Sequence, residues 1–179
     1  VSANHANTCI LANSHHPATK QFRQNNEYNR HSLLLSGSQR TKNSSIQFTV
    51  NYTDLRAEIP SSLSENDFLN NPQSAAQNWL AIEGYEDYRK FIAGVTWEQE
   101  INERFNNSLT LFTSLNDHYE PRPFNTLADF SFSKGLREEI IYQLERVEML
   151  AGVELYHDNF NWQLYEPIGD EQGALLNDN

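Results

Sequence analysis

The sequence predicts an all-β protein, an antiparallel meander of about six long strands that forms part of a transmembrane β-barrel with long extracellular loops. Apolar and polar residues alternate with a period of two along most of the chain. The alternating segments run for about 10–14 residues, which exceeds the usual strand length of a soluble sheet. Short turns and long polar links also alternate between these segments. These observations together favour strands that cross a membrane.

The composition narrows the class of protein. The 179 residues carry a net charge of −11, with a pI of about 4.9 and a mean hydropathy of −0.69. A nucleic-acid partner is excluded, because such binding depends on clustered Lys and Arg. No run of about 18 apolar residues occurs, which excludes a membrane-spanning helix. Cys9 is the single cysteine, so neither an internal disulfide nor a cysteine-based zinc site is expected.

Both ends of the sequence lack alternation. Residues 1–27 show neither a helical nor a strand period, and we expect an irregular N-terminal segment there. The pair His15 and His16 has no third ligand at a suitable spacing, so solvated coil is expected in place of a metal site. Residues 166–179 are polar and predict a truncated extracellular loop. The partial barrel is therefore expected to occupy residues 28–165.

The clearest strand contains Ile46, Phe48 and Val50 on one face and polar residues on the other. Alternation of this kind predicts strands over about 28–41, 44–56, 86–101, 106–119, 131–144 and 147–161. Sequential strands are expected to pair, because short connections favour neighbours. They should present one continuous, uncovered apolar face made by Phe48, Val50, Ala93, Val95, Leu109, Leu111, Val153 and Leu155.

Two kinds of connection alternate between the predicted strands. The short turns lie near Lys42, Glu103 and Arg146. The long polar links cover about 57–86, about 118–131 and the chain after Phe160. In an outer-membrane barrel the short turns face the periplasm and the long links face outside.

The long links carry local signals of their own. Asn71 followed by Pro72 has the pattern of an N-cap and first helical residue, which predicts a short loop helix over residues 72–82. In the second link, Pro121 and Pro123 favour extended backbone and are expected to exclude strand pairing.

A strand with one apolar and one polar face fits either a membrane barrel or a soluble sheet. A membrane-spanning strand needs about 9–11 residues, close to the predicted lengths. Aromatic residues near the strand ends are typical of interfacial girdles; they are Tyr52, Tyr88, Trp97, Tyr119, Tyr142, Tyr156 and Trp162. Two alternatives stay open: a small complete outer-membrane barrel with a structural or adhesion role, and a soluble β-barrel that binds a small ligand.

Several segments between residues 22 and 165 carry a family resemblance. They are FRQNNEYNR (22–30), VNYTDLRAEIPSSL (50–63), GYEDY (84–88), YEPRPFN (119–125), GVELY (152–156) and NWQ (161–163). These segments resemble the middle of the barrel domain of a TonB-dependent outer-membrane receptor of the ferric-siderophore type. The resemblance implies an internal fragment of a receptor in the outer membrane of a Gram-negative bacterium.

The resemblance also implies a function and partners. The receptor would take up an iron–siderophore complex or a similar nutrient chelate and would contact outer-membrane lipid. A TonB-type energy-coupling protein would act only through a plug domain, which has no counterpart in this sequence. About 22 strands close such a barrel, so this chain is not expected to transport alone. No cofactor is implied.

No nucleophile, base and orienting group occur in a pattern that predicts catalysis, so neither an enzyme nor a metal site is expected. The candidate ligand-binding residues, all in predicted extracellular loops or at their edges, are Arg56, His118, Arg122 and His157. A guanidinium pairs well with a carboxylate-rich chelate. A histidine beside a carboxylate, as in Asp117-His118 and His157-Asp158, can also contact a ligand.

Each candidate has a structural alternative. The histidine pairs also fit polar rim residues without a ligand. Arg122 and Arg56 also fit ion pairs with Glu120 and Glu58 that stabilise their loops. Arg122 is the strongest candidate, because the prolines on both sides of it lower the entropy cost of holding its backbone in place.

Overall fold

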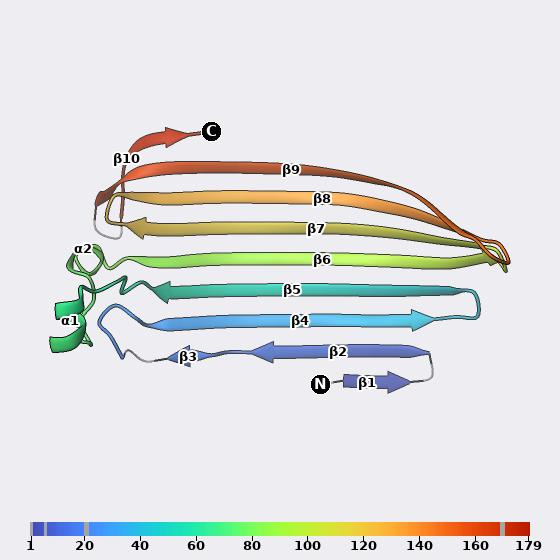
Figure 1. The fold of residues 1–179 in the computed structure, drawn as a ribbon, viewed down its shortest axis with the longest axis horizontal. Helices are drawn as coiled ribbons and strands as arrows, with labels where there is room; N and C mark the ends of the chain where they lie inside the picture. The colour runs from blue at the N-terminus through green and yellow to red at the C-terminus, as the bar shows by residue number, and fades with distance from the viewer. Residues whose placement is uncertain (1, 6, 20–21, 169–170) are drawn as a thin grey trace.

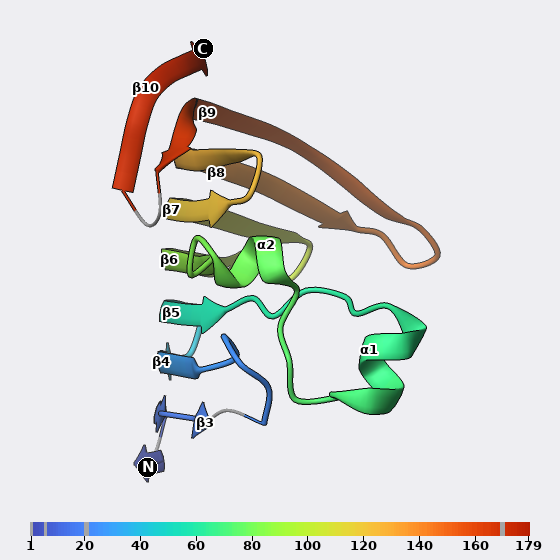
Figure 2. The same ribbon diagram turned by 90° about the vertical axis from the view of Figure 1, so that its left-hand side faces the viewer.

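The computed structural model describes residues 2–5, 7–19, 22–168 and 171–179. In this part of the chain ten strands pair antiparallel in one sheet (Figure 1). They are β1 (Ser2–His5), β2 (Thr8–His15), β3 (Ala18–Thr19), β4 (Tyr28–Arg40), β5 (Ser44–Glu58), β6 (Tyr85–Asn102), β7 (Phe105–Arg122), β8 (Asn125–Gln143), β9 (Glu148–Ile168) and β10 (Glu171–Asp178). The strands lie in chain order, with β3 beside β4, and form a single layer (Figure 2). The predicted antiparallel meander is therefore confirmed.

Strands β4 to β9 correspond to the predicted strands. β5 pairs with β6 without a register shift from Ser44↔Gln99 to Glu58↔Tyr85, as strict alternation on both strands favours. The turns at 41–43, 103–104 and 144–147 lie at one end of the sheet, called the turn end. The link 59–84 and the turn 123–124 lie at the opposite end, called the loop end (Figure 1).

Both terminal segments differ from the prediction. Residues 1–27 contain β1, β2 and β3 in place of irregular chain, and β2 pairs with β4 from Thr8↔Gln39 to His15↔Ser32. Residues 166–179 contain the end of β9 and β10 in place of a loop. A paired neighbour satisfies the backbone of these strands even though their side chains alternate weakly. Residues 1, 6, 20–21 and 169–170 lie outside the described residues.

The predicted long link at 118–131 is wrong, because β7 and β8 form a hairpin closed by a tight turn at 123–124. Pro121 pairs with Thr126 in this hairpin. β6 pairs with β7 only as far as Tyr119, so Pro121 lies where β7 has a partner strand on one side only. A strand tolerates proline at such an edge position, since no second ladder needs its missing N–H.

The link between β5 and β6 contains two short helices at the loop end (Figure 1). They are α1 (Glu65–Asn70) and α2 (Gln77–Leu80). The hydroxyl of Ser64 accepts from the N–H of Asp67 at 3.1 Å and caps α1. Asn71, the predicted N-cap, is instead the C-cap of α1. α2 covers only the middle of the predicted helix at 72–82.

The segment before β4 braces this link. Arg23 donates to the carbonyl of Ser61 at 2.8 Å and to that of Ser74 at 3.0 Å. Asn25 is buried and donates from Nδ2 to the carbonyl of Gly84 at 2.8 Å. Its φ of 51° is left-handed, a region in which asparagine is enriched. These contacts hold the link against the ends of β4, β5 and β6.

Burial is sparse in this sheet. Among the described residues, the buried apolar side chains are Leu55, Ala75, Tyr85 and Pro121. The principal contacts between strands follow the ladder, and no second layer formed by the described residues covers either face. No helix in the described ranges is long and apolar enough to cross a membrane. Apart from Leu55, Tyr85 and Pro121, the apolar side chains of the described strand residues therefore stay at least partly exposed.

Candidate functional site

One face of the sheet is apolar along β4 to β9, and we call it the apolar face. Phe48, Val95 and Leu111 lie opposite one another on β5, β6 and β7. Leu136 and Leu155 continue this row on β8 and β9. Leu111 is 49% exposed and Leu155 is 60% exposed. The predicted apolar face is therefore present and no other described part of the chain covers it, but on β8 it is interrupted and not continuous.

The apolar run shifts obliquely across the sheet. On β4 the apolar run consists of Leu33 and Leu35. Following the paired residues from strand to strand leads from Leu33 to Asn159 and from Leu35 to His157 on β9. On β9 the apolar side chains of this face lie closer to the turn end, at Met149, Ala151, Val153 and Leu155. Lys134 and Glu138 interrupt the run on β8. A band drawn through the apolar residues therefore crosses the strands at an angle.

The opposite face, which we call the polar face, carries side chains that pair across the strands. Nε of Arg137 on β8 donates to Oε2 of Glu154 on β9 at 2.6 Å. The ring of Phe112 on β7 packs over Gly135 of β8, which has no side chain to compete for the space. The two faces differ in chemistry from β5 to β8, whereas on β9 the polar face also carries Leu150, Tyr156, Phe160 and Trp162.

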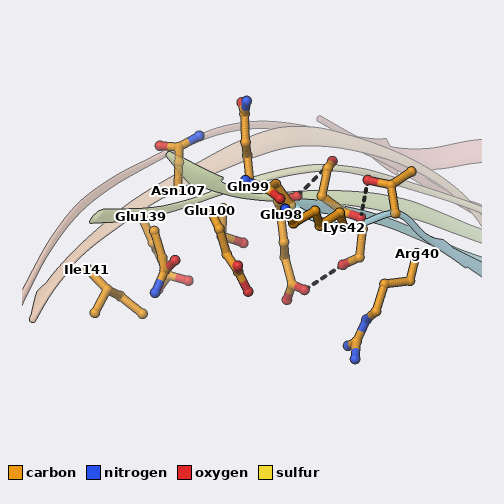
Figure 3. A pocket seen from close by; sticks show the side chains of 14 residues that line it. Arg40, Lys42, Glu98, Gln99, Glu100, Asn107, Glu139 and Ile141 are labelled. Carbon is orange, nitrogen blue, oxygen red and sulfur yellow. Dashed lines mark hydrogen bonds between the residues drawn. The ribbon is translucent and has the colours of Figure 1, made fainter. Parts of the chain in front are cut away.

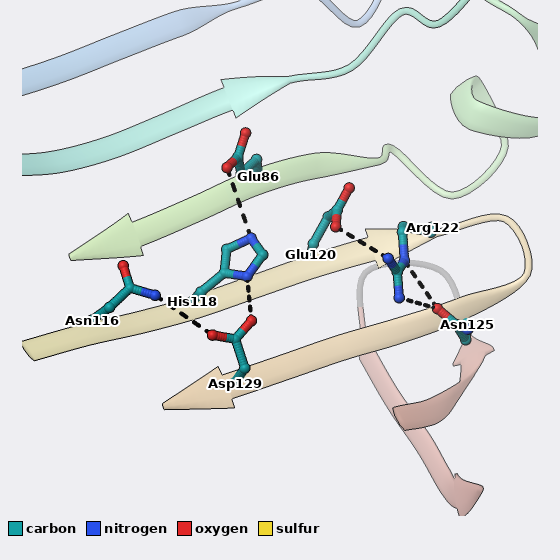
Figure 4. Close-up of polar contacts among 7 residues, drawn as sticks. All are labelled: Glu86, Asn116, His118, Glu120, Arg122, Asn125 and Asp129. Atoms are coloured by element: carbon teal, nitrogen blue, oxygen red, sulfur yellow. Dashed lines mark hydrogen bonds and ion pairs between the residues drawn. The ribbon is translucent and has the colours of Figure 1, made fainter. Parts of the chain in front are cut away.

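His118 on β7 lies between carboxylates from the two neighbouring strands (Figure 4). Its Nδ1 is 2.6 Å from Oδ2 of Asp129 on β8, and its Nε2 is 3.8 Å from Oε1 of Glu86 on β6. The His118 side chain is 16% exposed and that of Asp129 is 12% exposed. The structure thus places His118 within a strand, on the polar face near the loop end.

Arg122 ends β7 and belongs to the same face (Figure 4). Its Nε and Nη2 donate to Oδ1 of Asn125 at 2.9 and 2.6 Å. Its Nη1 lies 3.5 Å from Oε2 of Glu120, and its guanidinium carbon lies 5.1 Å from the centre of the Phe124 ring. The ion pair with Glu120 is thus present, and the guanidinium is held in a defined position at the loop end.

The other two candidate residues lie on the apolar face. Arg56 stacks on the ring of Tyr85 at 3.7 Å and approaches Asp87 at 3.6 Å. His157 lies in the middle of β9, opposite Lys134, and not at the start of a loop as the sequence predicts. The register therefore brings His118 and Arg122 together and separates both from Arg56 and His157.

Sequence reasoning missed the partners of His118 and Arg122. The predicted link over 118–131 includes Asp129, and no sequence pattern distinguishes Glu86 or Asn125. Adjacent pairing of the two strands would have placed Asp129 near His118, but Pro121 argued against that pairing. No cluster of three or more His, Cys, Asp or Glu side chains in the described ranges is arranged to hold a metal ion.

A second polar site lies at the turn end, where a hollow of about 480 Å³ opens (Figure 3). Its charged lining residues are Arg40, Lys42, Glu98, Glu100 and Glu139. The three glutamates point to the same side of the sheet (Figure 3), and Ser45 donates to Oε2 of Glu98 at 2.7 Å. The surplus of carboxylates disfavours an anionic ligand here, and no predicted site residue lies in it.

The fold and its two faces define the chain as an antiparallel β-meander that exposes one apolar and one polar surface. No protein-family model matches the sequence, and no curated protein matches it. The structure is similar to part of the crystal structure of the ferric citrate transporter FecA in the unliganded form, with a TM-score of 0.68 and 14% identity. The match covers 97% of this chain and 27% of the FecA chain. The likeness shows the fold, and this chain spans about a quarter of the transporter's length.

Proposed function

We propose that this chain is part of the barrel wall of a TonB-dependent outer-membrane receptor that takes up an iron–siderophore complex or a similar nutrient chelate. The similarity in fold to a ferric citrate transporter supports a transport role. The segments that resemble ferric-siderophore receptors support the same class. Since the match covers 27% of the FecA chain, barrel closure, uptake and energy coupling belong to the whole protein in this proposal.

The exposed apolar face is the observation that carries the proposal. Soluble monomers rarely expose apolar patches larger than a few hundred Å². This face extends over six neighbouring strands, β4 to β9, and side chains such as Leu111 remain about half exposed. An outer-membrane barrel presents such a band to lipid and keeps its polar side chains toward the lumen.

The oblique course of the apolar band supports tilted strands. The centre of the band lies about six residues nearer the turn end on β9 than on β4, an average of about one residue per strand, while β5, β6 and β7 share the same rows. A rise of about 3.3 Å per residue against a strand spacing of about 4.8 Å corresponds to a tilt of about 35°. Barrel strands tilt by about 35–45°, so a band level with the membrane would cross the strands at this angle.

In this proposal the polar face lines the lumen, and the loop end opens to the outside. His118 and Arg122 then face the ligand path, and the guanidinium of Arg122 supplies the positive charge that an anionic chelate needs. Arg56 and His157 would face outward, so ligand contact is assigned to His118 and Arg122. The remaining partners are outer-membrane lipid and a TonB-type coupling protein, reached through a plug domain.

The test is binding of ferric citrate and a panel of other iron chelates to the full-length receptor carrying Arg122→Ala. Loss of a charge-assisted contact should weaken binding of the cognate chelate about ten- to a hundredfold, which corresponds to about 1.5–3 kcal/mol. Lys42→Ala in the turn at 41–43 is the first control. Asn125→Ala is the second comparison, because it removes the acceptor that positions Arg122 but keeps the charge.

Lys42→Ala should bind the chelate as well as the native receptor, and Asn125→Ala should bind it less well than the native receptor but better than Arg122→Ala. Unchanged binding in Arg122→Ala, or an equal loss in Lys42→Ala, contradicts the assignment of Arg122. Failure of the native receptor to bind any iron chelate contradicts the proposed ligand class.

A further inference from the structure

The imidazole of His118 has one satisfied and one unsatisfied nitrogen. Asp129 offers only acceptor oxygens when ionised, so the 2.6 Å contact requires Nδ1 of His118 to carry a proton. In the neutral ring Nε2 is then a bare acceptor. Nε2 is shielded from solvent and has no hydrogen-bond partner in the structure. A buried acceptor without a donor costs free energy, so the neutral ring is incompletely satisfied at this position.

The nearest polar group to Nε2 is also an acceptor. Oε1 of Glu86 lies 3.8 Å away, beyond hydrogen-bonding distance. The Glu86 side chain is 43% exposed, which leaves it free to move the remaining fraction of an ångström. In the neutral ring, Nε2 of His118 and Oε1 of Glu86 are both acceptors and cannot bond. A proton on Nε2 would allow a charge-assisted hydrogen bond between them.

The charged and polar groups that face His118 come from three strands. They are Glu86, Tyr88 and Lys90 on β6, Asn116 and Glu120 on β7, and Asp129 on β8. Arg122 already engages Glu120, and Asn116 donates to Asp129 at 3.5 Å. Glu86 is therefore the carboxylate that a second imidazole proton would reach, while Asp129 keeps the first.

We propose that His118 is a proton-operated clamp that ties β6 to β8 across β7 at the loop end of the polar face. Imidazole is the side chain that ordinarily changes charge between pH 5 and 8. The protonated ring bonds Asp129 through Nδ1 and Glu86 through Nε2, whereas the neutral ring bonds Asp129 alone. The clamp is thus closed when the ring carries both protons and open when it carries one.

The inference does not depend on the proposed function, because it rests on three side chains of neighbouring strands. For a receptor it would have a consequence at the ligand site. Closing the clamp adds one positive charge two positions from Glu120 and four from Arg122 on the same strand, so an anionic ligand would gain attraction as the pH falls.

The experiment measures backbone hydrogen exchange by mass spectrometry in the full-length protein in detergent micelles at pH 5.5 and 7.5. After correction for the intrinsic pH dependence of exchange, peptides that cover the start of β6 should exchange about two- to fivefold more slowly at pH 5.5. His118→Gln and Glu86→Gln should each abolish this difference, since either change removes one partner of the acid-only bond.

His157→Gln is the matched control, because His157 is a strand histidine on the opposite face. It should leave the pH difference at β6 unchanged. The Glu86 side chain is partly exposed, so Glu86→Gln should fold normally. It therefore tests the clamp even if His118→Gln has a folding defect. The clamp is refuted if the native protein shows no extra protection at pH 5.5, or if either Glu86→Gln or His118→Gln retains it.

Discussion

The two faces of the sheet are built by the same strands, yet the polar face is stabilised by contact with water and the apolar face by an apolar environment. On the polar face polar and charged side chains pair across the ladder, as in Arg137 with Glu154 and His118 with Asp129. On the apolar face the paired residues Phe48, Val95 and Leu111 have hydrocarbon side chains without polar groups, and Val95 and Leu111 are exposed. Because successive side chains point to opposite faces, a step of one residue along a strand changes the required environment completely.

The largest effect expected from this comparison follows a charge placed on the apolar face. Leu111 lies near the centre of the apolar run on β7, so Leu111→Arg should cost about 2–4 kcal/mol of folding free energy in lipid vesicles. Thr49→Arg on the polar face is the control, because Thr49 is also exposed and should change stability by less than about 0.5 kcal/mol. Urea titration of the full-length protein in vesicles measures both. Equal costs would show that the two faces do not differ in environment.

A smaller effect is expected from glycines on the polar face, where Phe112 lies between Gly94 and Gly135. A Cβ on Gly135 would collide with the Phe112 ring and come within 2.8 Å of the carbonyl oxygen of Leu155. Gly135→Ala should therefore destabilise the protein by about 1–3 kcal/mol. A Cβ on Gly94 meets nothing closer than 3.7 Å, so Gly94→Ala should be neutral or slightly stabilising in the same titration.

The smallest effect concerns the exposed ion pair of the polar face. The side chains of Arg137 and Glu154 are 53% and 40% exposed, so solvent and salt screen their attraction. Arg137→Gln should cost less than about 1 kcal/mol, and the cost should shrink further in high salt. A salt-independent loss of several kcal/mol would mean that the polar face is not open to water.

The fold was largely predictable where alternation is strict. On β5 Ile46, Phe48 and Val50 set the register, and the strand bounds follow within a few residues. On β2 both Ile10 and Leu11 are exposed apolar residues, so neither face dominates and no period is visible. Such a strand forms because β4 offers it a ladder, which is a tertiary effect that local sequence does not contain.

The candidate site was predictable in part. The sequence offered an ion pair between Arg122 and Glu120 as the alternative to ligand contact, and that pair is present. The pairing of His118 with Asp129 depends on the β7–β8 register. This register was not predictable, because proline is usually excluded from paired strands. Assigning Arg56 and His157 to faces needed the register of the whole sheet.

The most direct test of the account is whether the apolar face contacts lipid. Single spin-labelled cysteines placed at positions 109 to 115 of β7, after Cys9→Ser, would be measured in the full-length protein in lipid bilayers. Odd positions should be accessible to oxygen, which dissolves in hydrocarbon, and even positions to a water-soluble nickel chelate, in strict alternation. Equal access of the nickel chelate to odd and even positions would contradict a lipid-facing surface and would favour a soluble sheet.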